Sequence, residues 1–346
     1  VREIGANDNW LARLSLNQLL FASGRVYYAH RAAAKRVESS RQEEETVKLG
    51  VARQTAKAYL SVLIAEAVTD VQREALSTAQ AHLEQVQNRY DAGVANRLEL
   101  LRAQVEVSNV EPRVIEAEQG IETSLILLRR ATGLGREVEI DLTSPLKAEV
   151  EPIDEEAELE RARSTRPEFK VLEHSQSATE DLALSERGGM LPMMQLTSTF
   201  GYEKPYFAIN EWEQVFTVGV GLQVPLFDGL ESYRGMRRAR AAAETITLAT
   251  VQTHANVRTE VRTAVLALRE AAVRMNSTKD NKERANQMLD ISKQSYAAGA
   301  ATNVEVIDAQ FAATTARLEH LKALYDYRNA QIHLSAATGD LTSMGR

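Results

Sequence analysis

Apolar and small residues recur at steps of three and four along two very long stretches of this chain. In residues 24–92 the stripe is formed by Leu60, Ile64, Ala67, Val71, Ala75, Ala79, Leu83, Val86 and Tyr90, and in residues 229–298 by Ile246, Ala249, Val257, Val261, Ala264, Leu268 and Ala271. This spacing is typical of amphipathic α-helices, and no proline interrupts either stretch. Each stretch therefore predicts a helix about 70 residues and about 100 Å long, which favours a coiled-coil or barrel-like assembly over a compact domain.

Three other segments, residues 10–20, 192–202 and 214–227, alternate between apolar and polar positions as β-strands do. Such strands fit either a half-buried soluble sheet or a membrane barrel with lipid outside and water inside. Taken alone the pattern favours a soluble sheet, but no helices remain to cover it once the long helices are assigned, and this favours the barrel. The face expected toward lipid carries Trp10, Leu14, Phe216, Val218, Val220 and Leu222, and the face expected toward the lumen carries Arg13, Asn17, Thr217 and Gln223.

The two long stretches belong to an internal duplication. Residues 90–104 (YDAGVANRLELLRAQ) align with residues 296–310 (YAAGAATNVEVIDAQ) and are identical at 7 of 15 positions. The same offset of 206 carries residues 20–21 (LF) onto 226–227 and residues 131–133 (ATG) onto 337–339 without a gap. Chance similarity between two helices would not also align the residues of the turns and of the segments that flank the helices. The sequence therefore predicts two copies of one structural unit.

Each copy contains a turn with a clear local cause. Gly93 and Gly299 can adopt the left-handed conformation that ends a helix. Three residues later Asn96 and Thr302 can cap the next helix, and in both copies a glutamate three positions further on can reach back as in a capping box. Each copy is therefore predicted to be a helical hairpin with a short tip.

The predicted organisation has three parts: a first repeat (residues 1–133), a linker (134–165) and a second repeat (166–346). The first repeat has a strand at about 10–20 and a hairpin at 24–131, and the second has a helix at 167–187, strands at 192–202 and 214–227, and a hairpin at 229–337. The linker is expected to contain a short strand at 138–142 and a short charged helix at 154–163. The first repeat lacks a counterpart of the helix and first strand of the second, so an upstream part with a signal peptide, a helix and a strand is expected before Val1.

Composition narrows the function further. The 346 residues include 41 Lys and Arg against 48 Asp and Glu, and the resulting net charge of −7 argues against a nucleic-acid partner. There is no cysteine, so disulfides and thiolate metal sites are excluded. The six histidines have no metal-ligand spacing, and the sequence contains no phosphate-binding loop, nucleophile elbow or zinc-protease motif. We therefore expect neither an enzyme nor a bound cofactor or metal.

At this point the residues resemble a known family. Residues 224–229 (VPLFDG) mark the change from strand to helix, residues 166–168 (RPE) open the second copy, and both tips carry a Tyr-x-x-Gly motif. Together with the two copies of strand and long hairpin, these motifs resemble the TolC family of outer-membrane efflux and secretion channels, over nearly the whole chain. The chain resembles a family member that lacks the first helix and strand.

The resemblance implies a mainly α fold with a β-barrel part. Three copies would form a helical tunnel in the periplasm, continued by a β-barrel in the outer membrane of a Gram-negative bacterium. The implied partners are two further copies of the chain, outer-membrane lipid, a periplasmic adaptor (membrane fusion protein) and an inner-membrane transporter. The channel would be a passive duct of a tripartite efflux pump or a type I secretion system, with the cargo selected by the transporter.

The resemblance also assigns a gate to the hairpin tips. Tyr296 matches a tyrosine that holds the second hairpin closed, Glu305 and Asp308 match an acidic constriction, and Glu99 matches an acid of the closing network. The chain departs from the family at Ala301, where an arginine links neighbouring hairpins, and Arg97 is a candidate substitute. The residues expected to face the adaptor are Gly93, Val94, Ala95, Gly299, Ala300 and Ala301.

Two alternatives stay open on the sequence. Helix capping alone can account for Glu99 and Glu305, whereas Asp308 lies too far into its helix to serve as a cap. A soluble periplasmic coiled-coil adaptor or scaffold protein is the alternative function, although adaptors usually need only one hairpin and the pattern here is duplicated.

Overall fold

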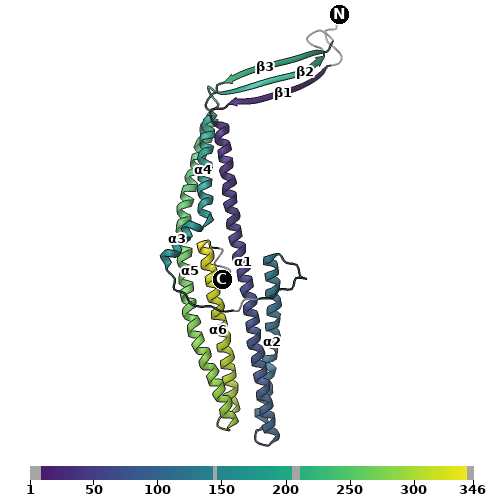
Figure 1. The fold of residues 1–346 in the computed structure, drawn as a ribbon, viewed down its shortest axis with the longest axis vertical. Helices are drawn as coiled ribbons and strands as arrows, with labels where there is room; N and C mark the ends of the chain where they lie inside the picture. The colour runs from purple at the N-terminus through teal and green to yellow at the C-terminus, as the bar shows by residue number, and fades with distance from the viewer. Residues whose placement is uncertain (1–8, 143–145, 205–210, 341–346) are drawn as a thin grey trace. The chain divides into compact units, whose positions relative to one another are not determined.

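The computed structural model describes residues 9–142, 146–204 and 211–340, and these residues are mostly helical with one small sheet. In chain order the elements are β1 (Trp10–Phe21), α1 (Arg25–Asp91), α2 (Arg97–Thr132), α3 (Glu155–Thr165), α4 (Pro167–Gly188), β2 (Met193–Lys204), β3 (Glu213–Gln223), α5 (Glu231–Ala297) and α6 (Asn303–Thr338) (Figure 1). None of the described helices is long and apolar enough to cross a membrane.

The chain divides into two compact units. One comprises the chain up to Glu44 together with Glu168–His254, and the other comprises Glu45–Pro167 together with the chain from Ala255 onward. The units do not coincide with the two sequence repeats, because α1 and α5 each contribute to both units. The duplication is therefore a repeat of elements along the chain and not a pair of domains.

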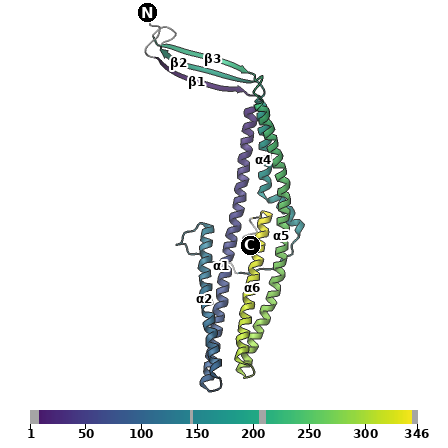
Figure 2. The same cartoon turned by 180° about the vertical axis from the view of Figure 1, so that it is seen from behind.

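The sheet of the first unit is antiparallel, in the order β1-β2-β3 (Figures 1 and 2). Its register pairs Leu14 with Phe200 and Phe200 with Phe216, so that the apolar positions of the three strands form one face. Ser15, Thr199 and Thr217 are paired in the same way on the opposite face. The apolar face is uncovered, since Leu14 and Phe216 are both exposed.

The third strand is shorter than the expected 214–227, because β3 ends at Gln223. Pro225 has no backbone N–H to continue the ladder, and the residues that follow form the turn before α5. Leu226 and Phe227 consequently lie outside the sheet with strongly exposed side chains.

α4 lies beside the parts of α1 and α5 that are nearest to the sheet (Figures 1 and 2). The Ser39 and Ser175 hydroxyls are 3.0 Å apart, and the Ser185 hydroxyl donates to the Arg25 carbonyl at 2.9 Å. On the other side, the rings of Phe169 and His254 stack with centroids 4.4 Å apart. These contacts place α4 against both long helices of its unit.

The second unit contains the tip-proximal parts of the first hairpin (α1 and α2) and of the second hairpin (α5 and α6). Small residues let the second hairpin pack closely, because Ala285 and Leu289 of α5 form one buried cluster with Ala309, Ala313 and Ala316 of α6. All four helix boundaries at the tips lie within one or two residues of the expected ones.

The linker is less regular than expected. Residues 138–142 form no strand, and residues 143–145 lie outside the described part of the chain. The Val138 carbonyl accepts a bond from the Arg129 side chain instead of a strand neighbour, and no described strand lies alongside to pair with it. The short charged helix does form, as α3, with Asp154 as its N-cap.

Candidate functional site

The backbone has the same conformation at both hairpin tips. Gly93 and Gly299 adopt φ of 74° and 77°, the left-handed conformation that a side chain would strain. The N–H groups of Val94 and Ala300 donate back to carbonyls in the last turn of α1 and α5, at 2.8 Å each. These bonds satisfy carbonyls that the helix ends would otherwise leave free, so local chemistry alone produces the turn.

The caps of the two returning helices differ in detail. Thr302 and Glu305 form a complete capping box: the Glu305 carboxylate accepts from the Thr302 N–H at 2.6 Å, and the Thr302 hydroxyl accepts from the Glu305 N–H at 3.3 Å. In the first hairpin the Asn96 side chain caps the Glu99 N–H at 3.0 Å, and its amide donates to the Glu99 carboxylate at 2.8 Å. Both glutamates thus take part in capping.

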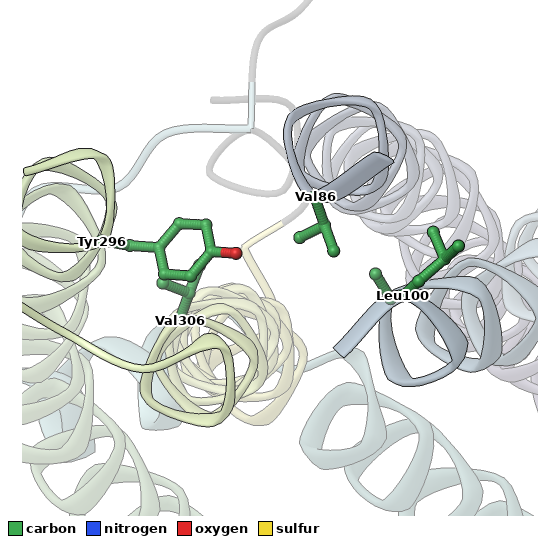
Figure 3. Close-up of a cluster of buried hydrophobic side chains, with 5 residues drawn as sticks. Val86, Leu100, Tyr296 and Val306 are labelled. Carbon is green, nitrogen blue, oxygen red and sulfur yellow. The ribbon is translucent and has the colours of Figure 1, made fainter. Parts of the chain in front are cut away.

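Tyr296 packs between the two hairpins. It is only 2% exposed and lies in a cluster with Val86 of α1, Leu100 and Ala103 of α2, and Val306 of α6, here called the tip cluster. Figure 3 shows its ring extending from the second hairpin toward Val86 and Leu100. The Tyr296 hydroxyl has no hydrogen-bond partner among the described residues, and burial raises the pKa of this hydroxyl above its usual value.

A buried polar contact lies beside the tip cluster. The His82 Nε2 is 2.6 Å from the Asn303 side-chain oxygen, and both residues are almost fully buried. The Asn303 amide also donates to the Glu99 carbonyl at 2.9 Å, so this one side chain of α6 contacts both helices of the first hairpin. Burial lowers the pKa of His82, and the nearby Lys293 lowers it further, although the bond to Asn303 opposes the shift.

Arg89 makes a second polar contact between the hairpins. Its guanidinium donates to the Tyr296 carbonyl at 3.0 Å and lies 4.8 Å from the centre of the Tyr296 ring. Arg97, the candidate substitute for the arginine missing at Ala301, is exposed to solvent. Near the tip of the first hairpin, Arg89 and not Arg97 reaches the second hairpin within one chain, and farther from the tips Arg317 of the second hairpin pairs with Glu74 of the first at 2.8 Å.

His82 is a buried residue that the apolar periodicity does not predict. The periodicity places Leu83 on the buried face of the helix, whereas the structure buries His82 and leaves Leu83 only partly buried. The spacing of three between the buried Ala79 and His82 is the only local signal, and a polar side chain buried there needs a hydrogen-bond partner. Its partner, Asn303, lies in the other repeat and has no comparable signal.

The remaining predicted residues lie at the surface of the tips except Ala95, which is buried and so cannot face an adaptor as predicted from the sequence, and Ala301, which is half-buried. Glu305 and Asp308 are both exposed on the first turns of α6. The capping bonds from Thr302 hold the pKa of Glu305 below its usual value, so this carboxylate is charged at neutral pH. Gly93, Val94, Gly299 and Ala300 are exposed.

An open groove between α2 and α6 was not predicted. Its lining is mostly apolar and consists of Leu98, Leu101, Arg102, Val105, Glu106, Val304 and Ile307. Leu98 and Val105 are exposed there. Among the described residues, no group of three His, Asp or Glu side chains is placed to hold a metal ion.

Comparison with known proteins gives a consistent result. The family model described as "Outer membrane efflux protein" matches residues 5–134 and 159–340. The alkaline protease secretion protein AprF of Pseudomonas aeruginosa is 25% identical over 96% of this chain and 70% of its own length. The outer membrane protein TolC of Vibrio cholerae is 23% identical over 90% of this chain and 72% of its own length.

The fold is also found among solved structures. The outer membrane protein VceC of Vibrio cholerae superposes with a TM-score of 0.75 at 17% identity, covering 96% of this chain and 87% of VceC. At this identity the likeness concerns the fold, and it extends over nearly all of both chains.

Proposed function

This chain belongs to the outer membrane efflux protein family, and we propose that it is the outer-membrane channel of an efflux pump or secretion system, opened and closed at its helical tips. The observation that carries the gating proposal is the contact between the hairpins. It combines a small apolar cluster around Tyr296 with the polar contacts His82–Asn303 and Arg89–Tyr296 and, farther from the tips, the Arg317–Glu74 ion pair at 2.8 Å. Such a contact is specific in geometry and small enough to separate without unfolding either helix.

The sheet supports placement in the outer membrane. Its exposed face carries Leu14, Phe216 and Val220, whereas the opposite face carries Ser15 and Thr217. This division suits a barrel wall with lipid on one side and a water-filled lumen on the other. Strands β1 and β3 are the edges of the described sheet, and edges within a membrane must be paired. In the proposal, two further copies of the chain supply those neighbours and complete a trimer.

The tips then lie at the periplasmic end of the duct. Glu305 and Asp308, exposed on one face of α6, would be repeated around the axis of a trimer and form an acidic constriction. The outer tip residues, Gly93, Val94, Gly299 and Ala300, are exposed and free to meet a periplasmic adaptor that connects the duct to an inner-membrane transporter. AprF is named for protease secretion, so a secreted polypeptide is one class of cargo.

The alternative of a soluble adaptor or scaffold is not supported. The family match covers both repeats, and its members are outer-membrane efflux proteins. No observation on the described residues favours the adaptor over the channel.

Planar-bilayer recording of the purified full-length protein tests the gate. The wild type is expected to form pores of low conductance, and Tyr296→Ala is expected to raise the conductance because it removes the ring that joins the hairpins. Tyr296→Phe is the matched control, since the hydroxyl has no partner and its loss should leave the conductance unchanged. Pores with the same conductance in the wild type and Tyr296→Ala would contradict the gate, and a wild type that forms no pore would contradict the channel.

A further inference from the structure

Three strand–helix junctions meet at one end of the sheet. β1 ends at Phe21, which pairs with Met194, and β3 ends at Gln223, which pairs with Met193. α1 starts at Arg25 soon after β1, α5 starts at Glu231 after the turn that follows β3, and α4 ends at Gly188 shortly before β2. Gly188 and Gly189 at the end of α4 lie against Arg25 and Ser232, so the starts of both long helices are held at the same level.

These helix starts carry more basic than acidic residues, although Asp228 and Glu231 stand at the start of α5 and the Glu186 carboxylate at the end of α4 lies beside Gly235. The exposed arginines other than the paired Arg31, here called the arginine collar, are Arg25, Arg36, Arg234, Arg237, Arg238 and Arg240. No acidic residue occurs between Gly24 and Val37 on α1 or between Ser232 and Ala243 on α5. The whole chain has a net charge of −7, so this local excess opposes the overall balance.

The collar is largely unneutralised within the chain. In the part of the chain that the structure describes, no salt bridge joins a collar arginine to an acid, whereas the adjacent Arg31 pairs with the buried Asp181 at 3.4 Å. The collar arginines stand at exposed positions spread over several turns of two helices. A single small anion would contact only one or two of them, whereas a layer of anionic groups could contact those that lie at its level on both helices.

Aromatic and apolar side chains lie at the same level. Leu226 and Phe227, just before α5, are 94% and 80% exposed, and Tyr27 and Tyr233 on the first turns of α1 and α5 are exposed as well. Tyrosine and phenylalanine next to basic residues are typical of the boundary between membrane and water. Arginine matches phosphate geometry through paired N–H donors.

From this juxtaposition we propose that the arginine collar binds the anionic phospholipid headgroups of the membrane leaflet that faces the periplasm. The proposal rests on the proposed function, because the sheet must lie in the membrane for the collar to be at its surface. The apolar sheet face then contacts the acyl chains, the aromatic side chains lie at the boundary, and the arginines contact the phosphate layer. The collar would fix the depth of the channel in the bilayer.

The test compares two variants of equal charge. In the collar variant Arg234, Arg237, Arg238 and Arg240 are replaced by Gln, and in the control variant the exposed Arg53, Lys57, Lys279 and Arg284 of the other unit are replaced by Gln. The full-length protein in neutral detergent is mixed with phosphatidylglycerol, phosphatidylcholine or inorganic phosphate, and the thermal midpoint and the oligomeric state are measured. Conductance in bilayers is recorded for each protein in parallel.

We expect phosphatidylglycerol, and neither of the other two additions, to raise the thermal midpoint of the wild type and the control variant by several degrees. The collar variant should lose most of this rise, and added salt should reduce it in the wild type, because the charges are exposed. An equal rise in the collar variant, or the same rise with inorganic phosphate, would overturn the proposal. Loss of oligomers by the collar variant without lipid would also overturn it, because the arginines would then bind a neighbouring copy.

The bilayer recordings separate this proposal from the proposed function. If the wild type forms channels but phosphatidylglycerol does not raise its thermal midpoint, only the lipid-binding role of the collar is refuted. If the wild type forms no channels, the proposed function itself is refuted.

Discussion

The two hairpin tips have the same turn but different contacts. At the offset of 206, Gly93 corresponds to Gly299 and both adopt the left-handed conformation. The exposed Arg97, however, corresponds to the buried Asn303. His82 likewise corresponds to the exposed Met288.

The difference shows how a duplicated chain makes an asymmetric interface. The turn is produced by local bonds that each copy forms for itself, so the same residue types serve both. The contact between the copies needs complementary side chains, and here the residues that make it, such as His82 and Asn303, stand where the copies differ. Exchanging residues between equivalent positions should therefore affect one tip far more than the other.

The largest effect is expected from Asn303→Arg, which gives the second tip the residue of the first. Asn303 is 2% exposed, so the new charge would be buried beside His82, whose ring cannot neutralise it. We expect a loss of about 3 to 5 kcal/mol in the local stability of the tips. The reciprocal change, Arg97→Asn, is at an exposed site and should stay within about 0.5 kcal/mol. Hydrogen exchange of the tip amides measures both, and equal effects would contradict the buried contact.

The two tyrosines give the next comparison. Tyr296→Ala removes a buried ring from the tip cluster and should cost about 3 to 5 kcal/mol, as other large-to-small core changes do. Tyr90, its counterpart, is only partly buried against the same cluster, and Tyr90→Ala should cost distinctly less. Hydrogen exchange at residues of α2 near Leu100 reports the difference. A larger effect for Tyr90 would mean that the first hairpin, not the second, supplies the central ring.

Acid should weaken the contact through His82. Burial lowers the pKa of His82 from 6.5, with a further lowering by Lys293, so the contact favours the neutral ring. The stabilisation that His82 gives the contact between the hairpins is fully present above pH 6.5. It is lost as the pH falls from 6.5 toward the lowered pKa of the buried ring, because His82 binds a proton more readily when the hairpins are separated. Tyr296 of α5 and Asn303 of α6 also contact the ring, and neither supplies a charge near neutral pH.

The measurement is the rate of cross-linking between the hairpins, or conductance, from pH 8 down to 5 at constant salt. His82→Gln keeps an amide that can bond to Asn303 but cannot titrate in this range, so the acid response should be reduced in this variant. The same response in His82→Gln would assign the effect to another group.

The sequence was sufficient to predict the features that depend only on residues close to one another along the chain. The hairpin bounds, the left-handed glycines and the caps at Asn96 and Thr302 all follow from local residue types. The end of β3 at Gln223 was missed because the alternation continues past Pro225, although the proline cannot extend the ladder. The contact between His82 and Asn303 could not be predicted, since a helical stripe shows which face is buried but not which distant side chain meets it.

The smallest structural effect should come from changes that separate capping from charge at the tips. Thr302→Ala removes the hydroxyl that caps the Glu305 N–H, and a loss of about 1 kcal/mol is expected. Glu305→Gln retains an acceptor for the Thr302 N–H while it removes the negative charge, because glutamine also completes a capping box.

Thermal unfolding and cation selectivity in bilayers together distinguish the two roles of Glu305. If its charge belongs to a constriction, Glu305→Gln should lower cation selectivity with almost no change in unfolding, and combining it with Asp308→Asn should lower the selectivity further, because the two carboxylates lie three residues apart on one helix face. Glu99→Gln is the matched change in the first hairpin, where the carboxylate bonds to the Asn96 amide. A weaker effect on selectivity there would place the constriction on the second hairpin, whereas unchanged selectivity in all three variants would leave capping as the role of both glutamates.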